Sequence, residues 1–158
     1  MKILLFSDSH GFIKNMIKVI EDNSDANMII HLGDYVRDVI RTQELYPLID
    51  FSYVRGNNDF ISNVPRERII NIQGKKIFIT HGHDYGVKNG YERIIQRAQL
   101  LNVDLVFFGH THRAKELIDG NRVFVNPGSI SVPIGLARPS YCIIEIDKDK
   151  CICEINTI

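Results

Sequence analysis

The sequence has no excess of either charge, since its 158 residues include 19 lysines and arginines and 19 aspartates and glutamates. Such a balance creates no net field that would attract nucleic acid or an anionic membrane non-specifically. No apolar run approaches the ~18 to 20 residues of a membrane-spanning helix. The opening stretch MKILLFSDSH reaches Ser7 and Asp8 too soon to supply the apolar part of a secretory signal. We therefore expect a cytoplasmic protein with no membrane partner.

Cysteine is scarce and confined to the end of the chain, at Cys142, Cys151 and Cys153. An odd number without repeated spacing indicates neither a disulfide framework nor a zinc site. In the stretch CICEI, Cys151 and Cys153 would share one face of a strand and pack there as small apolar side chains. The chain also lacks internal repeats, low-complexity segments and linkers, so we expect one domain over residues 1–158.

Short apolar runs alternate with amphipathic stretches along the chain. KILLF and MIIHL have the length of buried strands, and the residues between them recur at helical spacing, which predicts a βαβ unit with parallel strands. A helix over 36–45 and a strand FSYV follow. Further along, the sequence predicts a helix near 91–98, a strand over 103–108, and hairpins over 68–80, 115–125 and 141–155. The pattern indicates a mixed α/β fold.

Polar residues follow five of the predicted strands, and α/β proteins build their sites at such carboxyl ends. In the motifs at Asp8-x-His10 and His110-x-His112, two-residue steps in an extended backbone would project both side chains to one side. Neighbouring glycines would permit tight turns and close approach of the backbone. The residues expected to gather are Asp8, His10, Asp34, Asn57, His81, His110 and His112.

Oxygen and nitrogen donors without a thiolate suit Mn²⁺, Fe²⁺, Co²⁺, Ni²⁺ or Zn²⁺, and four imidazoles make calcium or magnesium less natural. Seven donors are too many for one tetrahedral ion. They predict two ions ~3.5 to 4 Å apart with a bridging carboxylate, which would turn a bridging water into hydroxide for attack at phosphorus. A singly charged phosphodiester would bring the net charge of two dications, two aspartates and a hydroxide to zero, whereas a phosphomonoester dianion would leave the centre negatively charged.

The ordered motifs DSH, GD, GNND, HGH and GHTH resemble those of the calcineurin-like metallophosphoesterases, in particular the small bacterial and archaeal phosphodiesterases, and NPGS at 126–129 is also similar to theirs. The resemblance runs from Lys2 to about Ile146. It implies a four-layer αββα sandwich of two mixed β-sheets flanked by helices, whereas periodicity alone suggests an open sheet. It also implies a first metal on Asp8, His10 and His112, a second on Asn57, His81 and His110, and a bridge through Asp34.

The expected cofactors are thus two divalent ions per chain, with Mn²⁺ first and Ni²⁺, Fe²⁺, Zn²⁺ or Co²⁺ as alternatives. The resemblance implies that Asp34, Asn57, His81 and His110 act in catalysis through the hydroxide that the metals generate. In many relatives a histidine follows the ligand asparagine, but Asn58 stands here, and an amide is no general acid near neutral pH. Diesters with acidic leaving groups are therefore expected, and His83 is the alternative acid.

Four other residues near these motifs have simpler interpretations. His31, inside the MIIHL strand, is expected to be a hydrogen-bonded core histidine. Asp59 is expected to hydrogen-bond a ligand or its own loop. Asn126 and Ser129 are expected to shape the pocket through the turn at Pro127-Gly128.

The leading functional hypothesis is a phosphodiesterase acting on a small phosphodiester. A protein-interaction scaffold is the alternative from another class, because the same fold serves in a retromer subunit. A nuclease is less favoured, since the chain shows no basic surface or added DNA-binding domain. A homo-oligomer, dimer or tetramer, stays open because apolar residues of the terminal hairpin could pair with a second copy.

Overall fold

The computed structural model describes residues 1–60 and 62–158, and the predicted elements are found in the predicted order. The helices are α1 (Lys14–Asp22), α2 (Val36–Leu45) and α3 (Glu92–Leu101), with a 3₁₀ turn, η1, at His83–Tyr85. The strands are β1 (Lys2–Phe6), β2 (Met28–His31), β3 (Asp50–Tyr53), β4 (Glu67–Ile72), β5 (Lys75–Thr80), β6 (Leu105–Phe108), β7 (Ala114–Asp119), β8 (Arg122–Pro127), β9 (Ser140–Ile146) and β10 (Cys151–Thr157).

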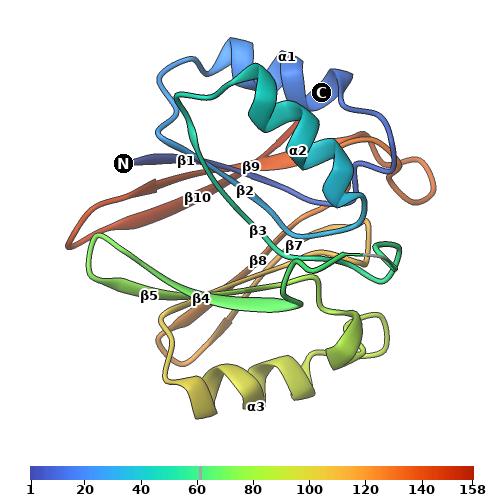
Figure 1. Cartoon of the computed structure of the whole chain (residues 1–158). Coiled ribbons are helices and arrows are strands. Elements are labelled where there is room, and N and C mark those ends of the chain that lie inside the picture. The colour runs from blue at the N-terminus through green and yellow to red at the C-terminus, as the bar shows by residue number, and fades with distance from the viewer. Residues whose placement is uncertain (61) are drawn as a thin grey trace.

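The strands form two five-stranded mixed sheets, in the orders β10-β9-β1-β2-β3 and β4-β5-β6-β8-β7. In the first sheet β1, β2 and β3 are parallel, and β9 is antiparallel to both β1 and β10. In the second sheet β5, β6 and β8 are parallel, and the edge strands β4 and β7 are antiparallel to their neighbours. Figure 1 shows the sheets stacked face to face, with α1 and α2 covering one and α3 covering the other. The expected four-layer αββα sandwich is confirmed, and the open sheet that periodicity alone suggests is wrong.

Central strands are apolar on both faces because each sheet lies between two layers. Along β1, Ile3 and Leu5 point into the core between the sheets, while Leu4 and Phe6 pack under α1. In the second sheet Phe107 of β6 contributes to the same inter-sheet core, and its neighbours pack against α3. The sandwich therefore explains why KILLF and LVFF are unbroken apolar runs.

The parallel strands place the polar loops at one end of both sheets. The chain leaves β1, β2 and β3 of one sheet, and β5, β6 and β8 of the other, at the motifs identified in the sequence. In open α/β sheets the carboxyl ends of parallel strands are where ligands bind, and here two such edges face each other. The fold thus assembles the site from both sheets.

The hairpins and the cysteines follow the sequence-based expectations. The turn between β4 and β5 is Gln73-Gly74, with φ of 51° and 82°, as a two-residue hairpin loop requires. Cys151 and Cys153 alternate with exposed residues along β10 and pack against the inter-sheet core. Within 1–60 and 62–158, none of the helices has the length and apolar character needed to cross a membrane.

Candidate metal centre

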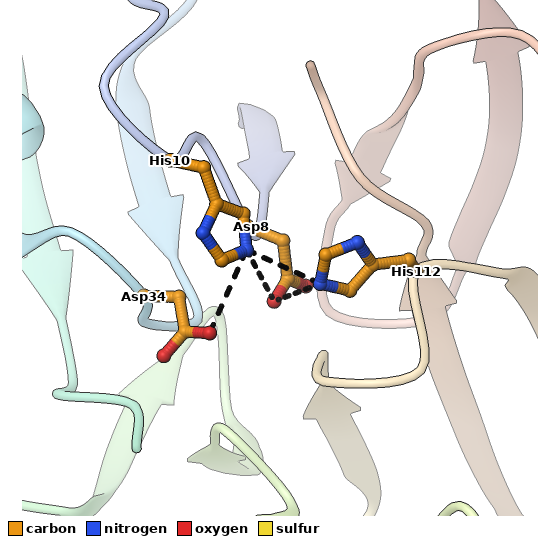
Figure 2. A group of neighbouring side chains, drawn as sticks. All are labelled: Asp8, His10, Asp34 and His112. Carbon is orange, nitrogen blue, oxygen red and sulfur yellow. Dashed lines mark hydrogen bonds and ion pairs between the residues drawn. The ribbon is translucent and has the colours of Figure 1, made fainter. Parts of the chain in front are cut away.

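Four acidic and imidazole side chains converge where the loops after β1, β2 and β6 meet. Asp8, His10, Asp34 and His112 each offer a ligand atom within 4.8 Å of the others. Figure 2 shows the four side chains pointing toward one another. His10 Nε2 lies 3.2 Å from His112 Nε2 and 3.6 Å from Asp34 Oδ2. Two imidazole nitrogens at that separation with carboxylates beside them form a donor set for a divalent transition-metal ion.

Asp8 is the most enclosed member of this group, with no solvent exposure. Its Oδ2 accepts hydrogen bonds from Ser7 Oγ at 2.6 Å and from the His110 backbone N–H at 3.1 Å. Its Oδ1 accepts none from the described residues, yet it lies 3.2 Å from His112 Nε2. Burial acts to raise the pKa of Asp8, but His112, His81 and Ser7 lower it to about 2. Asp8 is therefore a buried carboxylate with one oxygen left for a cation.

A second set of donors adjoins the first. His81 Nε2 lies 3.1 Å from Asn57 Oδ1 and 3.2 Å from His110 Nδ1. Asp34 lies between the two sets, because its Oδ1 is 3.5 Å from His81 Nε2 while its Oδ2 faces His10. The structure thus brings together all seven residues that the sequence singled out.

Backbone carbonyls orient two of the histidines. His81 Nδ1 donates to Leu32 O at 2.8 Å, and His112 Nδ1 donates to Val132 O at 2.6 Å. With the proton on Nδ1, each ring presents the lone pair of Nε2 to the site. Metal-binding histidines are commonly oriented by such a hydrogen bond from the second ring nitrogen.

Burial and neighbouring charges shift the pKa values of three histidines at the site. Burial is the main cause that lowers the pKa of His10, and together with His81 it lowers the pKa of His110 to about 4. Both rings are therefore neutral near pH 7, the form that binds a cation. The pKa of His112 is raised instead, chiefly by the Asp8 carboxylate, so its extra proton would occupy the position facing Asp8 Oδ1.

The loop conformations differ from the extended geometry used to interpret the two-residue motifs. Within residues 1–60 and 62–158, five of the eight non-glycine residues with positive φ are predicted ligands: Asp8, His10, Asp34, His110 and His112, at 47° to 68°. Extended backbone is therefore the wrong reason for their convergence. Left-handed backbone costs a non-glycine residue of order 1–3 kcal/mol and persists only where surrounding contacts impose it.

The loop after β8 supplies part of that constraint. Asn126 Nδ2 donates to Gly109 O at 2.8 Å and to Thr111 Oγ1 at 3.0 Å, which supports the GHTH loop. Ser129 Oγ donates to Asp8 O at 2.7 Å. The expectation that Asn126 and Ser129 shape the pocket is thus confirmed, although they do so through side-chain hydrogen bonds as well as through the turn.

The remaining sequence-based expectations have mixed outcomes. Asp59 accepts from the backbone N–H of Gly56 in its own loop, as expected, and also from the backbone N–H of Val36 at the start of α2. The expectation that His31 is fully hydrogen-bonded is wrong. It is buried and its Nδ1 accepts from Gly33, but its Nε2 has no partner among the described residues.

The two candidates for a further catalytic role both lie at the site. Asn58 donates from Nδ2 to Asp34 Oδ2 at 2.6 Å. The His83 ring lies 5.3 Å from that of His81 and 6.0 Å from that of His110, between ring centroids. Neither geometry assigns a proton transfer.

The sequence reasoning missed Asp38, which is buried in the first turn of α2. Its Oδ2 accepts from Ser9 Oγ and from the Gly11 backbone N–H, both at 2.7 Å, and so fixes the loop that carries His10. An aspartate in the first turn of a helix is usually a favourable and exposed charge. Only the folded structure, which places Asp38 beside the loop after β1, distinguishes it from such an exposed aspartate.

Comparisons with known proteins identify relatives of this chain. Residues 1–149 match the model of the calcineurin-like phosphoesterase superfamily domain. A probable metallophosphoesterase of Bacillus subtilis is 31% identical over 94% of this chain and 86% of its own. A phosphodiesterase of Methanocaldococcus jannaschii is 35% identical over 81% of this chain and 83% of its own. The structure of vacuolar protein sorting 29 from Cryptosporidium parvum superposes with a TM-score of 0.82 at 19% identity, covering 99% of this chain and 91% of that one, and shows the fold alone.

Proposed function

Because the chain belongs to the calcineurin-like phosphoesterase superfamily, we propose that it is a metal-dependent phosphodiesterase that acts on a small phosphodiester. The proposed cofactors are two divalent ions per chain, with Mn²⁺ as the first to test. The relatives from B. subtilis and M. jannaschii, named as a probable metallophosphoesterase and a phosphodiesterase, support this reaction class.

The free oxygen of Asp8 carries the proposal. This oxygen is buried and accepts no hydrogen bond from the described residues, and a bound cation would compensate for the cost of burying it. The imidazole nitrogen of His112 lies 3.2 Å from it, and the nitrogens of His10 and His81 are each 3.9 Å from it. This arrangement of donors around one buried carboxylate oxygen fits a metal ion.

Under this proposal Asp8, His10 and His112 hold the first ion, and Asn57, His81 and His110 hold the second. Asp34 serves both, since one carboxylate oxygen faces each set. Such ions, when bound, act as Lewis acids on phosphoryl oxygens and make hydroxide available near neutral pH. The backbone carbonyls of Leu32 and Val132 keep the ring nitrogens of His81 and His112 directed at the site.

The preference for acidic leaving groups follows from Asn58. Its amide can donate a hydrogen bond to a phosphate oxygen but cannot protonate a leaving alkoxide. A leaving group that departs as a stable anion, such as a nitrophenolate, needs no such proton. His83 is the residue to test if alkyl esters are cleaved.

The test is restoration of activity after chelation. Protein stripped with a chelator should hydrolyse bis-p-nitrophenyl phosphate when Mn²⁺ is returned, faster than p-nitrophenyl phosphate, and Asp34→Asn should lose bound metal and activity together. Stoichiometric metal binding without hydrolysis under any divalent ion would reject the enzyme. It would favour the scaffold alternative, for which the likeness to vacuolar protein sorting 29 supplies only the fold.

A further inference from the structure

A pocket of about 460 Å³ opens beside the Asp34 side of the candidate metal centre. Its walls include Tyr35, Arg37, Ile40, Asn58, Asp59 and Phe60. Two of these residues connect it to the centre: Asn58 donates to Asp34 Oδ2, and the Tyr35 ring meets the His10 ring edge-on with centroids 5.2 Å apart. These contacts place the pocket within reach of a group attached to a phosphate at the centre.

Arg37 is the one basic residue among the described residues of the lining, and its guanidinium lies over an aromatic ring. Its guanidinium carbon lies 4.6 Å from the centroid of the Tyr35 ring. Stacking of this kind fixes the plane of a guanidinium while leaving its N–H groups available for a ligand. No ion pair engages Arg37 within residues 1–60 and 62–158, and its side chain is exposed. Arg37 is thus an oriented cation without a carboxylate partner in that part of the chain.

The nearby carboxylates are engaged elsewhere. Both oxygens of Asp59 accept backbone N–H groups, from Val36 at 2.8 Å and Gly56 at 2.9 Å. Asp38, beside Arg37 in the sequence, is buried and accepts from Ser9 and Gly11. These bonds hold both acids in place, so Arg37 has no competing acceptor within hydrogen-bonding range in the described structure.

The backbone conformation of Tyr35 supports a role for this arrangement in binding. Tyr35 has φ 76° and ψ 62°, a left-handed conformation that is rare for an aromatic residue. The residue directly precedes α2, and its conformation sets the ring between His10 and Arg37. Strained residues cluster at binding sites because surrounding contacts hold them in a functional geometry.

The lining also includes two apolar side chains, those of Ile40, which is 44% exposed, and Phe60, which is 84% exposed. A pocket of this volume with apolar walls and one oriented charge suits a flat organic group that bears an anion.

We propose that this pocket binds the non-reacting arm of the phosphodiester and that Arg37 selects arms carrying a second phosphate, as in a nucleotide. The inference rests on the proposed function and names the substrate class for it. Arg37 acts here through hydrogen bonds from its guanidinium fork to the second phosphate, the pairing for which arginine is best suited.

Two substrates that differ only in the second phosphate test the proposal. Thymidine 5′-(p-nitrophenyl phosphate) and its 3′-phosphorylated form share the scissile bond and the leaving group. The wild type should show a kcat/KM about tenfold higher for the 3′-phosphorylated form, through KM, and Arg37→Met should bring the ratio near one. Arg37→Gln serves as a second variant at this exposed position.

Arg41→Met is the matched control, because Arg41 is exposed one turn later on α2 and does not line this pocket. It should keep the wild-type ratio. A wild-type ratio near one, or an Arg37→Met ratio equal to that of the wild type, overturns the proposal.

Binding without metal separates this inference from the proposed function. Calorimetry in the presence of chelator should show that thymidine 3′,5′-bisphosphate binds the wild type and the Arg41 variant about tenfold more tightly than the Arg37 variants. If no variant hydrolyses bis-p-nitrophenyl phosphate, the proposed function fails while Arg37-dependent binding still supports the pocket. Equal binding by all proteins overturns the pocket even where hydrolysis is observed.

Discussion

Asn58 donates two hydrogen bonds to Asp34, from its side-chain Nδ2 to Oδ2 at 2.6 Å and from its backbone N–H to Oδ1 at 3.0 Å. Asn58 therefore contacts the carboxylate that lies between the two donor sets. Its amide is directed at the centre as a neutral donor. The chemistry of this position is hydrogen bonding to anions, not proton transfer.

The leaving group should consequently control the rate. We predict that bis-p-nitrophenyl phosphate is hydrolysed at least about a hundredfold faster than glycerol phosphate, because general acid catalysis worth about that factor is missing. Asn58→His should reduce the difference in hydrolysis rate between these two substrates. Comparable turnover of both substrates by the wild type would show that another group, with His83 as the first candidate, donates the proton.

Divalent metal should stabilise the fold through Asp8. At a Mn²⁺ concentration about 100 times the dissociation constant, binding contributes about 2.7 kcal/mol, which corresponds to a rise in Tm of about 5 to 10 °C for a chain of this size. Asp8→Asn should abolish most of the rise. Asp25→Asn is the control, since the Asp25 side chain is 72% exposed and its ion pair in the described part of the chain is with Lys2. Equal shifts in all three proteins, measured by thermal denaturation, would place the metal elsewhere.

Gly56 should be essential for the position of Asp34. A Cβ on Gly56 would lie 2.1 Å from Asp34 Oδ1 and 2.5 Å from its backbone nitrogen, so Gly56→Ala must displace that carboxylate. We expect at least about tenfold weaker metal binding, as when a supporting contact of a ligand is lost.

Gly74→Ala provides the comparison for that variant. Gly74 has φ of +82° in the β4–β5 turn, with nothing within 4 Å of an added Cβ. The alanine there should cost about 1–2 kcal/mol of stability through its backbone conformation. Metal affinity, measured by titration, should stay at the wild-type value, and a loss equal to that of Gly56→Ala would refute the steric explanation.

His31 should make the metal-free protein less stable in acid. Burial lowers its pKa from 6.5 to about 4, partly offset by the nearby carboxylates of Asp8, Asp38 and Asp59. Between these two values the unfolded chain binds a proton that the folded chain excludes. The free energy of unfolding therefore falls as pH falls through this window, by at most about 1.4 kcal/mol per pH unit for this group.

The difference between wild type and His31→Leu isolates that contribution. Denaturant unfolding in chelator across this window should show a shallower pH dependence for the variant, although its stability at neutral pH is reduced by loss of the acceptor for the Gly33 N–H. Identical slopes would mean that His31 titrates normally in the folded state.

Much of the local structure and the donor set follow from the sequence. The spacing of apolar residues from Val36 to Leu45 matches the observed helix, and the hairpin predicted over residues 68–80 forms with its turn at Gln73-Gly74. These features depend on neighbours a few residues apart, so local rules capture them. The donors Asp8 and His110 were found the same way, because each follows an apolar strand.

By itself, then, the sequence determined the order of the strands and helices, the types of donor atom and the strand ends at which they occur. Only the tertiary structure decided that two sheets, and not one open sheet, bring Asp8 and His81 together, and that left-handed loops held by Asp38 and Asn126 aim the ligands. It also revealed Arg37 stacked on Tyr35 beside the centre. The physical reason is that these contacts join residues far apart in the chain or depend on backbone conformations that no residue pattern specifies, so their energies exist only once the sheets have packed.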